Sequence, residues 1–290
     1  MHKLNLLNLK MDDILISIVI VNYNTKDLLY NCVKSIIDSI KAINYEIIIV
    51  DNKSSDNSAL CCEKYKSKSN INIVYLDDNL GFSKANNIGV ERSKGIILHF
   101  LNPDTEVSSS LDDDYKTIIT NYQNNEDFVY VNPLQNPEED PAYGKNWIPT
   151  VDNYLNYRFN RAKTKYYYIG ATVIISRKNF VLIGKWNESF FMYIEDAELF
   201  YKIDKYRIPI IEMPSIIGHL GGGASKNVFS QLQREILIQK SFAIFYKENR
   251  SLIEYFFMQI LILLTFWNKP KRLLFQVKAV FYSFRFNKLS

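Results

Sequence analysis

The sequence predicts an α/β fold, with a mostly parallel central sheet flanked by helices and a helical extension at the C-terminal end. Three observations lead to this prediction. Strand-like apolar runs alternate with helical segments of about a dozen residues. The runs end in polar residues, and the composition becomes apolar and basic near the C-terminus.

The strands of the predicted sheet are apolar runs rich in β-branched residues. Such runs are typical of strands that are covered on both faces. They are expected at residues 14–21, 45–50, 71–76 and 95–101. Because the crossovers of βαβ units are right-handed, the C-terminal tips of these strands should lie at one edge of the sheet.

Helices are expected between the strands. Residues 26–43 carry apolar side chains at a helical period. The segment that contains Cys61 and Cys62 should form the next helix, and residues 79–91 should begin as a Gly-containing loop and continue as a helix. This order of elements indicates a parallel sheet.

The second half of the chain is less regular. Residues 132–165 are rich in Pro, Asn and Tyr, which predicts an irregular excursion over the surface. Residues 166–176 return to a strand pattern. No internal repeat is visible.

Composition limits the function classes. The chain has 290 residues, of which 47% are hydrophobic and 23% charged, as in ordinary globular proteins of one large or two modest domains. The net charge of +4 gives little support to nucleic-acid binding. Three cysteines without a Cys-x-x-Cys pair predict neither a disulfide framework nor a structural zinc site. Residues 1–13 lack the apolar core of a signal peptide, so a short N-terminal arm and no export are expected.

The strand tips are polar at all four positions. They are Asn22-Tyr23-Asn24, Asp51-Asn52, Asp77-Asp78-Asn79 and Asn102-Pro103-Asp104. Open parallel sheets bind ligands at the edge where these tips meet. The tips therefore predict a ligand site.

Each candidate residue at these tips has a plain alternative. Asp104 follows Asn102-Pro103, which is ordinary turn chemistry, or it holds a metal ion at the mouth of the sheet. Asp51 is placed either to cap a helix or to contact a ligand. His99 alternates within a strand, which favours a packed core position.

A second acidic pair, Glu195 and Asp196, follows the aromatic cluster 190–193 and precedes a helical pattern. Acidic residues in the first turn of a helix are favourable to its dipole. Aromatic walls also desolvate a carboxylate and raise its basicity, as a general base requires. The residues alone leave both interpretations open.

Several motifs occur together in the order of one known family. The chain resembles the inverting nucleotide-sugar glycosyltransferases of glycosyltransferase family 2, which have the GT-A fold, and among them the rhamnosyltransferase-type bacterial members that build surface polysaccharides. The matching segments are IVIVNYN (18–24), IIIVDNKSSDNS (47–58), DDNLGFSKANNIG (77–89), FLNPDTEV (100–107), IGATVIISRKNF (169–180), GKWNESFFMYIEDAELFYK (184–202) and GHLGGGAS (218–225). The resemblance implies a catalytic domain at 14–228, with a nucleotide-binding half at 14–107 and an acceptor half at 108–228.

The resemblance also implies the residues that bind the donor. Tyr23 and Asn24 would flank the nucleobase, and Asp51 would accept a hydrogen bond from the imide N–H of uracil or thymine. Residues at the loop-to-helix junction after the third strand would face the diphosphate, namely Asn79, Gly81 and Asn87.

The resemblance further implies a metal ion, Mg²⁺ or Mn²⁺. Asp104 would contact this ion, and His219 would be its second protein ligand. Many relatives have an aspartate where this chain has Asn102, so metal affinity in the absence of nucleotide should be low. The run of glycines after His219 would allow close approach to phosphate.

For catalysis, the resemblance assigns the general base to Asp196. Glu195 and Glu198 would orient that base or contact the acceptor. Trp186 and Phe191 would form an apolar platform for a sugar ring, although plain core packing is an alternative for both.

The implied reaction is an inverting transfer of a sugar from a nucleotide diphosphate donor to a saccharide or lipid-linked saccharide in cell-surface polysaccharide synthesis. The donor that the resemblance favours is dTDP-L-rhamnose. The alternatives are a UDP-hexose or UDP-N-acetylhexosamine donor, a catalytically inactive nucleotide-sugar or carbohydrate-binding module, and a non-glycosyl nucleotidyltransferase. The absence of an early Gly-rich basic phosphate loop disfavours the last of these.

The C-terminal extension, expected at 229–290, contains an apolar run at 252–267 that is followed by Lys269, Lys271 and Arg272. The run is shorter than the ~20 residues that span a bilayer, and Glu254 and Gln259 interrupt it. Apolar segments with flanking cations suit a helix pair in the membrane interface. We therefore expect peripheral membrane contact through 252–286, at the inner face of the cell membrane. The alternatives are a helical hairpin packed on the catalytic domain and a homodimer contact.

Overall fold

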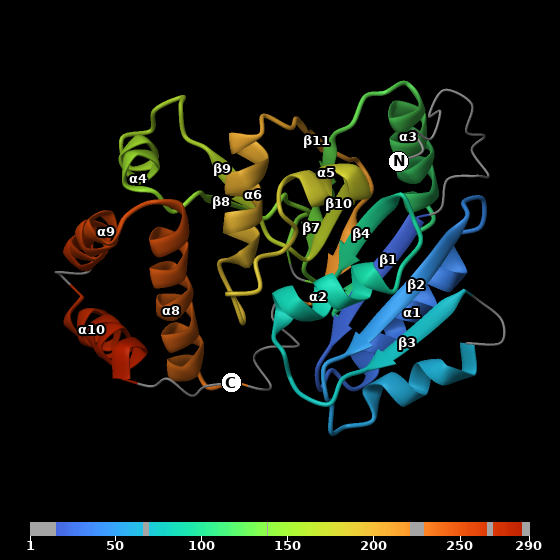
Figure 1. Cartoon of the computed structure of the whole chain (residues 1–290), viewed down its shortest axis with the longest axis horizontal. Helices are drawn as coiled ribbons and strands as arrows, with labels where there is room; N and C mark the ends of the chain where they lie inside the picture. Colours follow the sequence, from blue (N-terminus) through green and yellow to red (C-terminus); the bar gives the residue numbers. More distant parts are fainter. Residues whose placement is uncertain (1–15, 66–69, 138, 221–228, 266–268, 286–290) are drawn as a thin grey trace.

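The computed structural model describes residues 16–65, 70–137, 139–220, 229–265 and 269–285 and confirms the α/β prediction (Figure 1). The expected N-terminal arm at 1–13 and the glycines that follow Leu220 lie outside the described residues. The predicted domain boundaries at 107 and 228 stay predictions.

The central sheet has seven strands among the described residues, in the order β11-β6-β10-β4-β1-β2-β3. The strands are β1 (Ile16–Asn22), β2 (Tyr45–Asp51), β3 (Ile71–Tyr75), β4 (Ile97–Leu101), β6 (Val129–Val131), β10 (Thr172–Ser176) and β11 (Ile210–Glu212). The β1–β4 block and the β6–β11 pair are parallel, and β10 is antiparallel to both of its neighbours. In the β1–β2 register Asn22 lies beside Asp51, so these strand tips meet as predicted.

Two small sheets flank the central one. Strands β5 (Thr105–Glu106), β12 (Ile217–His219) and β7 (Leu134–Gln135) form the first, and β8 (Lys145–Trp147) pairs with β9 (Tyr166–Tyr168) in the second. The antiparallel pair β5–β12 places His219 opposite Thr105. This pairing brings residues 217–219 back to the segment that follows β4.

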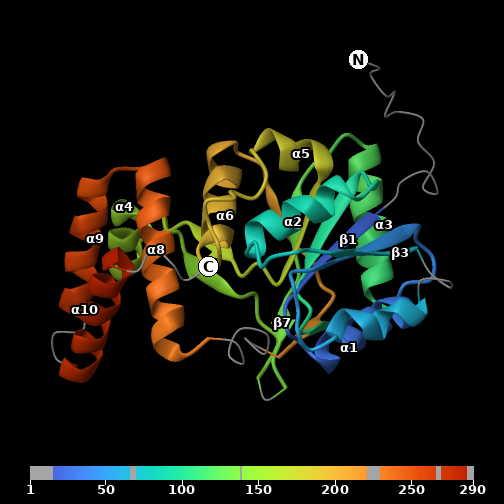
Figure 2. The same cartoon turned by 60° about the horizontal axis from the view of Figure 1, so that its bottom comes forward.

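Helices cover both faces of the central sheet (Figure 2). One face packs α1 (Asp27–Ser39), the 3₁₀ helix η3 (Ser58–Tyr65) and α3 (Leu111–Gln123) against alternate residues of β1 such as Ile18. The other face packs α2 (Phe82–Glu91), α5 (Arg177–Leu182) and α6 (Glu195–Lys205) near Val19 and Phe100. Successive strand residues point to opposite faces, which explains why the strands are apolar throughout.

Three helices stand together at one end of the molecule (Figures 1 and 2). They are α8 (Gln231–Asn249), α9 (Leu252–Thr265) and α10 (Pro270–Arg285), with α4 (Val151–Arg158) packed against α9. A separate core joins α8 and α9 to the rest of the fold, and in it Phe190 packs with Phe245 and Tyr255. The predicted helical extension is therefore present, and it packs against the rest of the fold.

Three details of the sequence prediction need correction. Residues 132–165 are not uniformly irregular, because they contain β7, β8 and the helix α4. The expected strand at 166–176 is divided into β9 and β10, and the residues between them lie at the candidate site. The helix with Cys61 and Cys62 is a 3₁₀ helix.

His99 is confirmed as a core residue: it is fully buried and contacts the Tyr115 hydroxyl at 2.6 Å.

Candidate active site

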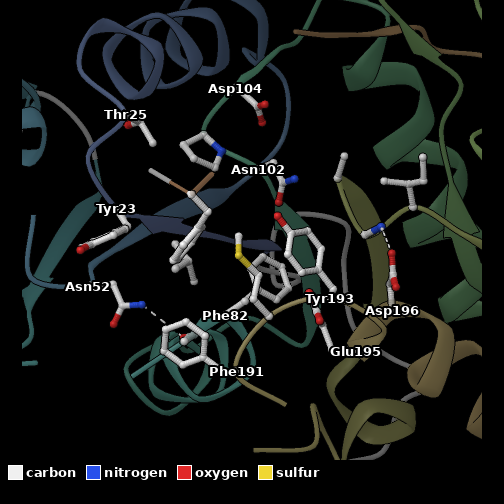
Figure 3. Close-up of a pocket in the computed structure, with 18 of the residues that line it drawn as sticks. Tyr23, Thr25, Asn52, Phe82, Asn102, Asp104, Phe191, Tyr193, Glu195 and Asp196 are labelled. Carbon is white, nitrogen blue, oxygen red and sulfur yellow. Dashed lines mark hydrogen bonds between the residues drawn. The ribbon is translucent and has the colours of Figure 1, made fainter. Parts of the chain in front are cut away.

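A cavity of about 260 Å³ lies at the C-terminal edge of the sheet (Figure 3). Its walls come from the tip of β1, the segment after β4, residues 169–171, the loop 191–196 and the end of β12. Nine of the residues that line it were predicted from the sequence: Tyr23, Asn79, Gly81, Asn102, Asp104, Phe191, Glu195, Asp196 and His219.

The tip of β1 presents Tyr23 to the cavity, whereas the predicted residues Asn24 and Asp51 are not among those that line it (Figure 3). Asp51 is 5% exposed, accepts hydrogen bonds from the Asn22 amide at 2.6 Å and from the Ser54 N–H at 3.1 Å, and does not line the cavity. Asn24 accepts from the Ser55 N–H at 2.8 Å. The side chains of Asp51 and Asn24 thus fix the shape of the two strand tips.

Asn52 joins the tip of β2 to the next loop. Its side-chain amide donates to the Asn79 Oδ1 at 2.8 Å, and its Oδ1 accepts from the Leu80 N–H at 2.8 Å. Gly81 follows with φ +81° and ψ 174°, a conformation that only glycine adopts readily. A Cβ there would lie 2.4 Å from the Phe191 carbonyl oxygen, so the loop 191–196 rests directly on this glycine.

Asp104 and His219 lie close together on one wall of the cavity. The Asp104 Oδ1 is buried without a hydrogen-bond partner and lies 3.7 Å from the His219 Nε2. This separation is too long for a hydrogen bond. A carboxylate oxygen and an imidazole nitrogen facing each other at this distance are a donor set that suits a divalent cation.

The two groups would supply only part of a cation's coordination sphere. Within the described residues no group of three or more His, Cys, Asp and Glu side chains is placed to hold a metal ion. A cation at Asp104 and His219 would therefore need oxygen ligands from a bound molecule such as a diphosphate. Weak metal affinity in the absence of nucleotide stays a prediction.

Glu195 and Asp196 begin α6 at another wall of the cavity. The two preceding residues, Tyr193 and Ile194, have φ values of 69° and 66°, which are strained for residues with a side chain and especially for a β-branched one. Asp196 accepts hydrogen bonds from the Gly170 N–H at 3.2 Å and the Ala197 N–H at 2.8 Å. These contacts fix the direction of its carboxylate.

Burial makes both carboxyl groups more basic than usual. It raises the pKa of Asp196, and it raises the pKa of Glu195 further because the neighbouring Asp196 charge acts in the same direction. The Glu195 Oε2 is buried and has no hydrogen-bond partner. Near neutral pH one carboxyl group of the pair is therefore ionised, and the other retains its proton.

Five predicted site residues do not line the cavity: Asp51 and Asn24, described above, and Trp186, Asn87 and Glu198. Trp186 is 1% exposed and packs edge-on against Phe82 and Phe100, so it is a core residue and not a sugar platform. Asn87 is buried and donates to the Trp186 carbonyl at 2.8 Å. Glu198 is 1% exposed, and its Oε1 lies 2.8 Å from the Lys202 Nζ, so it pairs with a lysine outside the cavity lining.

Other lining residues were given no role of their own by the sequence prediction. Asn52 belongs to the polar strand tip Asp51-Asn52 that predicted the site. Phe229 reaches the cavity from the start of α8, and nothing in its local sequence indicates this. The remaining unpredicted residues are Val21, Thr25, Phe82, Pro103, Ile169, Gly170, Ala171, Met192 and Tyr193.

Known structures share this architecture. The Staphylococcus aureus protein TarS (residues 1–349) superposes with a TM-score of 0.54 and 15% identity, covering 79% of this chain and 65% of TarS. GalNAc-T7, solved with UDP, GalNAc and Mn²⁺, superposes with a TM-score of 0.59 and 20% identity, covering 80% of this chain and 48% of that protein. The fold is thus that of the GT-A class of α/β proteins.

The sequence gives a narrower assignment. The chain belongs to glycosyl transferase family 2, whose family model matches residues 17–182. It is 28% identical over 218 residues to the low-salt glycan biosynthesis hexosyltransferase Agl10 of Haloferax volcanii, which covers 69% of this chain and 64% of Agl10. It is 34% identical over 91 residues to the putative teichuronic acid biosynthesis glycosyltransferase TuaG of Bacillus subtilis, covering 31% of this chain and 36% of TuaG.

Proposed function

We propose that this protein is an inverting glycosyltransferase that moves a sugar from a nucleotide diphosphate donor to a saccharide hydroxyl. The observation that carries the proposal is that Asp104 and His219 line the same cavity as Glu195 and Asp196. A charged donor can be held at the first pair while a base acts at the second. Family membership supports this assignment.

In this reaction the acceptor oxygen attacks the anomeric carbon of the donor sugar. The new C–O bond forms as the bond from the anomeric carbon to the diphosphate breaks, and the electron pair leaves with the nucleoside diphosphate. Asp196 takes the proton of the attacking hydroxyl, which is the role of a general base. Attack on the face opposite the leaving group inverts the anomeric configuration in one step.

Asp104 and His219 are the residues that would hold a divalent cation. When bound, such a cation supplies Lewis-acid stabilisation of the charge that develops on the leaving diphosphate. The buried, unpartnered Asp104 Oδ1 supports this assignment. Tyr23 lines the cavity at the tip of β1, where its ring can stack on a nucleobase.

The proposed donor is dTDP-L-rhamnose, with a UDP-linked hexose or N-acetylhexosamine as the alternative. The resemblance to rhamnosyltransferase-type members supports dTDP-L-rhamnose. The alternative is supported by the fold neighbours, because TarS was solved with UDP and with UDP-GlcNAc and GalNAc-T7 with UDP. The names of the relatives Agl10 and TuaG support an acceptor in a surface glycan. A saccharide or lipid-linked saccharide acceptor would suit peripheral contact at the inner face of the membrane.

The test is a donor screen followed by a transfer assay. The full chain is incubated with Mn²⁺ or Mg²⁺ and a panel of dTDP- and UDP-sugars, and the donor that raises the melting temperature most is identified. That donor is then supplied with saccharide acceptors, and the anomeric configuration of the product is determined by NMR. An inverted product supports the proposal, while a retained configuration or the absence of transfer with every stabilising donor contradicts it.

A further inference from the structure

The two last helices expose an unusual amount of apolar surface. Nine of the twenty large apolar side chains that are exposed among the described residues lie on α9 and α10. The set, called here the apolar helix face, consists of Leu252, Ile253, Phe256, Phe257, Ile260, Leu264, Leu274, Val277 and Phe281. On each helix the positions recur every three or four residues, so they lie along one side. Contiguous exposed patches of this kind mark interaction sites.

The interior of the same three-helix unit carries polar side chains. Each helix contributes one buried glutamine: Gln239 from α8, Gln259 from α9 and Gln276 from α10. The Gln259 amide donates to Gln239 at 3.0 Å, and the Gln239 amide donates to Gln276 at 3.3 Å. The Gln276 amide donates in turn to Glu235 at 3.1 Å.

In a bundle that is surrounded by water, buried positions are apolar and exposed ones are polar. This unit departs from that pattern, because its interior holds the glutamine network beside buried apolar residues such as Met258 and Ala279, and much of its surface is apolar. Hydrogen bonds between the glutamines stabilise the interior, since buried polar groups are costly unless they are paired. The large apolar groups are left on the outside. Such a unit is suited to surroundings that are themselves apolar on one side.

The charge of this region indicates which kind of apolar surroundings it fits. Residues 255–290 contain six Lys and Arg residues and no Asp or Glu. Because the whole chain has a net charge of +4, residues 1–254 together have a net charge of −2. Lys269, Lys271, Arg272 and Lys278 are exposed on or beside α10. Cationic groups next to an apolar face are complementary to an anionic lipid surface.

We propose that the apolar helix face docks onto an anionic lipid bilayer, with α9 and α10 lying in the interface. No helix among the described residues is long and apolar enough to cross a membrane. At 1.5 Å per residue, the 14 residues of α9 extend about 21 Å, less than the ~30 Å of a bilayer core. A second copy of the chain is a poorer occupant, because it would bring two cationic faces together.

The docking surface is coupled to the cavity wall. The Ser241 hydroxyl on α8 donates to the Met192 carbonyl at 3.0 Å, and Met192 lines the cavity together with Phe229 at the start of α8. Docking would therefore fix the orientation of the cavity relative to the lipid surface. The inference goes beyond sugar transfer, and vesicle binding is measured without nucleotide, so either proposal can fail without the other.

The experiment is co-sedimentation of the full chain with vesicles of phosphatidylcholine, with and without phosphatidylglycerol. We expect binding to the anionic vesicles that weakens with salt. The double variant Ile253→Glu, Phe257→Glu should bind at least about tenfold more weakly, because two charges enter the apolar face. Lys271→Gln, Lys278→Gln should bind roughly 30-fold more weakly to the anionic vesicles.

The matched control is Val181→Glu, Leu182→Glu on α5, where the side chains are 55% and 51% exposed. It introduces the same charges elsewhere and should bind as the wild type does. All substituted side chains are exposed, and an unchanged melting temperature verifies the fold. Absent wild-type binding, or an equal loss in the control, overturns the proposal. So does a wild-type dimer that Ile253→Glu, Phe257→Glu converts to monomer, since a second copy would then cover the face.

Discussion

Gly81→Ala tests whether the loop that carries the acidic pair is positioned by its contact with the start of α2. The new Cβ would lie 2.4 Å from the Phe191 carbonyl oxygen and 2.8 Å from its Cδ2. The Phe82 N–H donates to the same carbonyl at 2.8 Å, so the contact cannot open without loss of this hydrogen bond. Restoring an ordinary van der Waals distance requires a shift of about 1 Å.

The shift would reach the catalytic groups, because Phe191 and Asp196 belong to one short loop and helix start. A displacement of about 1 Å at a reacting group costs roughly 100-fold in rate. The backbone conformation of Gly81 adds about 1–3 kcal/mol of strain for alanine. We therefore expect Gly81→Ala to lower kcat for sugar transfer about 100-fold and to lower the melting temperature.

Gly184→Ala is the matched control. Gly184 also has a positive φ, of 86°, but the nearest atom to an added Cβ is the flexible Lys202 Nζ at 4.0 Å. This variant should lose about 1 kcal/mol of stability and keep its kcat. Steady-state kinetics and thermal unfolding are measured on both variants. Equal kcat values for Gly81→Ala and Gly184→Ala would refute the reasoning.

Four further outcomes are expected. Asp196→Asn should lower kcat about 1,000-fold while donor binding, measured by calorimetry, stays unchanged; retained turnover would remove Asp196 as the base. Because burial raises the pKa of Asp196 to about 6 and the base must be ionised, kcat should fall as pH decreases through about 6; an acidic limb near pH 4, the ordinary value for Asp, would contradict this. Burial raises the pKa of Glu195 to about 8, so the folded state loses stability as pH rises above the unfolded pKa of about 4.3. Glu195→Gln should therefore raise the melting temperature at pH 8 and change it little at pH 4, and an equal change at both pH values would argue against a desolvated carboxyl. His219→Ala should weaken Mn²⁺-dependent binding of UDP or dTDP at least about tenfold without affecting metal-free binding; equal affinities in Mn²⁺ would exclude His219 as a ligand.

The central sheet was predictable because its elements have local periodicity. The alternation of β-branched runs with helical segments fixed β1 to β4, and right-handed crossovers then placed Tyr23 and Asp104 at one edge. The resemblance to family 2 was confirmed by the family model. The polar strand tips also indicated the edge of the sheet at which the cavity lies.

The rest depended on contacts that leave no periodic pattern. The pair Asp104 and His219 was expected from the family resemblance alone, because the two residues meet through β5 and β12, which have two and three residues and lie more than a hundred residues apart. A motif position likewise does not distinguish a group that lines a cavity from one that packs behind it. Trp186 and Glu198 stand in the matching segments, yet one packs in the core and the other pairs with a lysine.

The most direct test of the proposed site is anomalous diffraction from crystals of the full chain grown with Mn²⁺ and UDP or dTDP. We predict a manganese peak in contact with the Asp104 carboxylate and the His219 imidazole, with the diphosphate extending from it toward the wall that carries Asp196. A manganese ion and nucleotide bound elsewhere, or a diphosphate directed away from Asp196, would contradict the proposed active site.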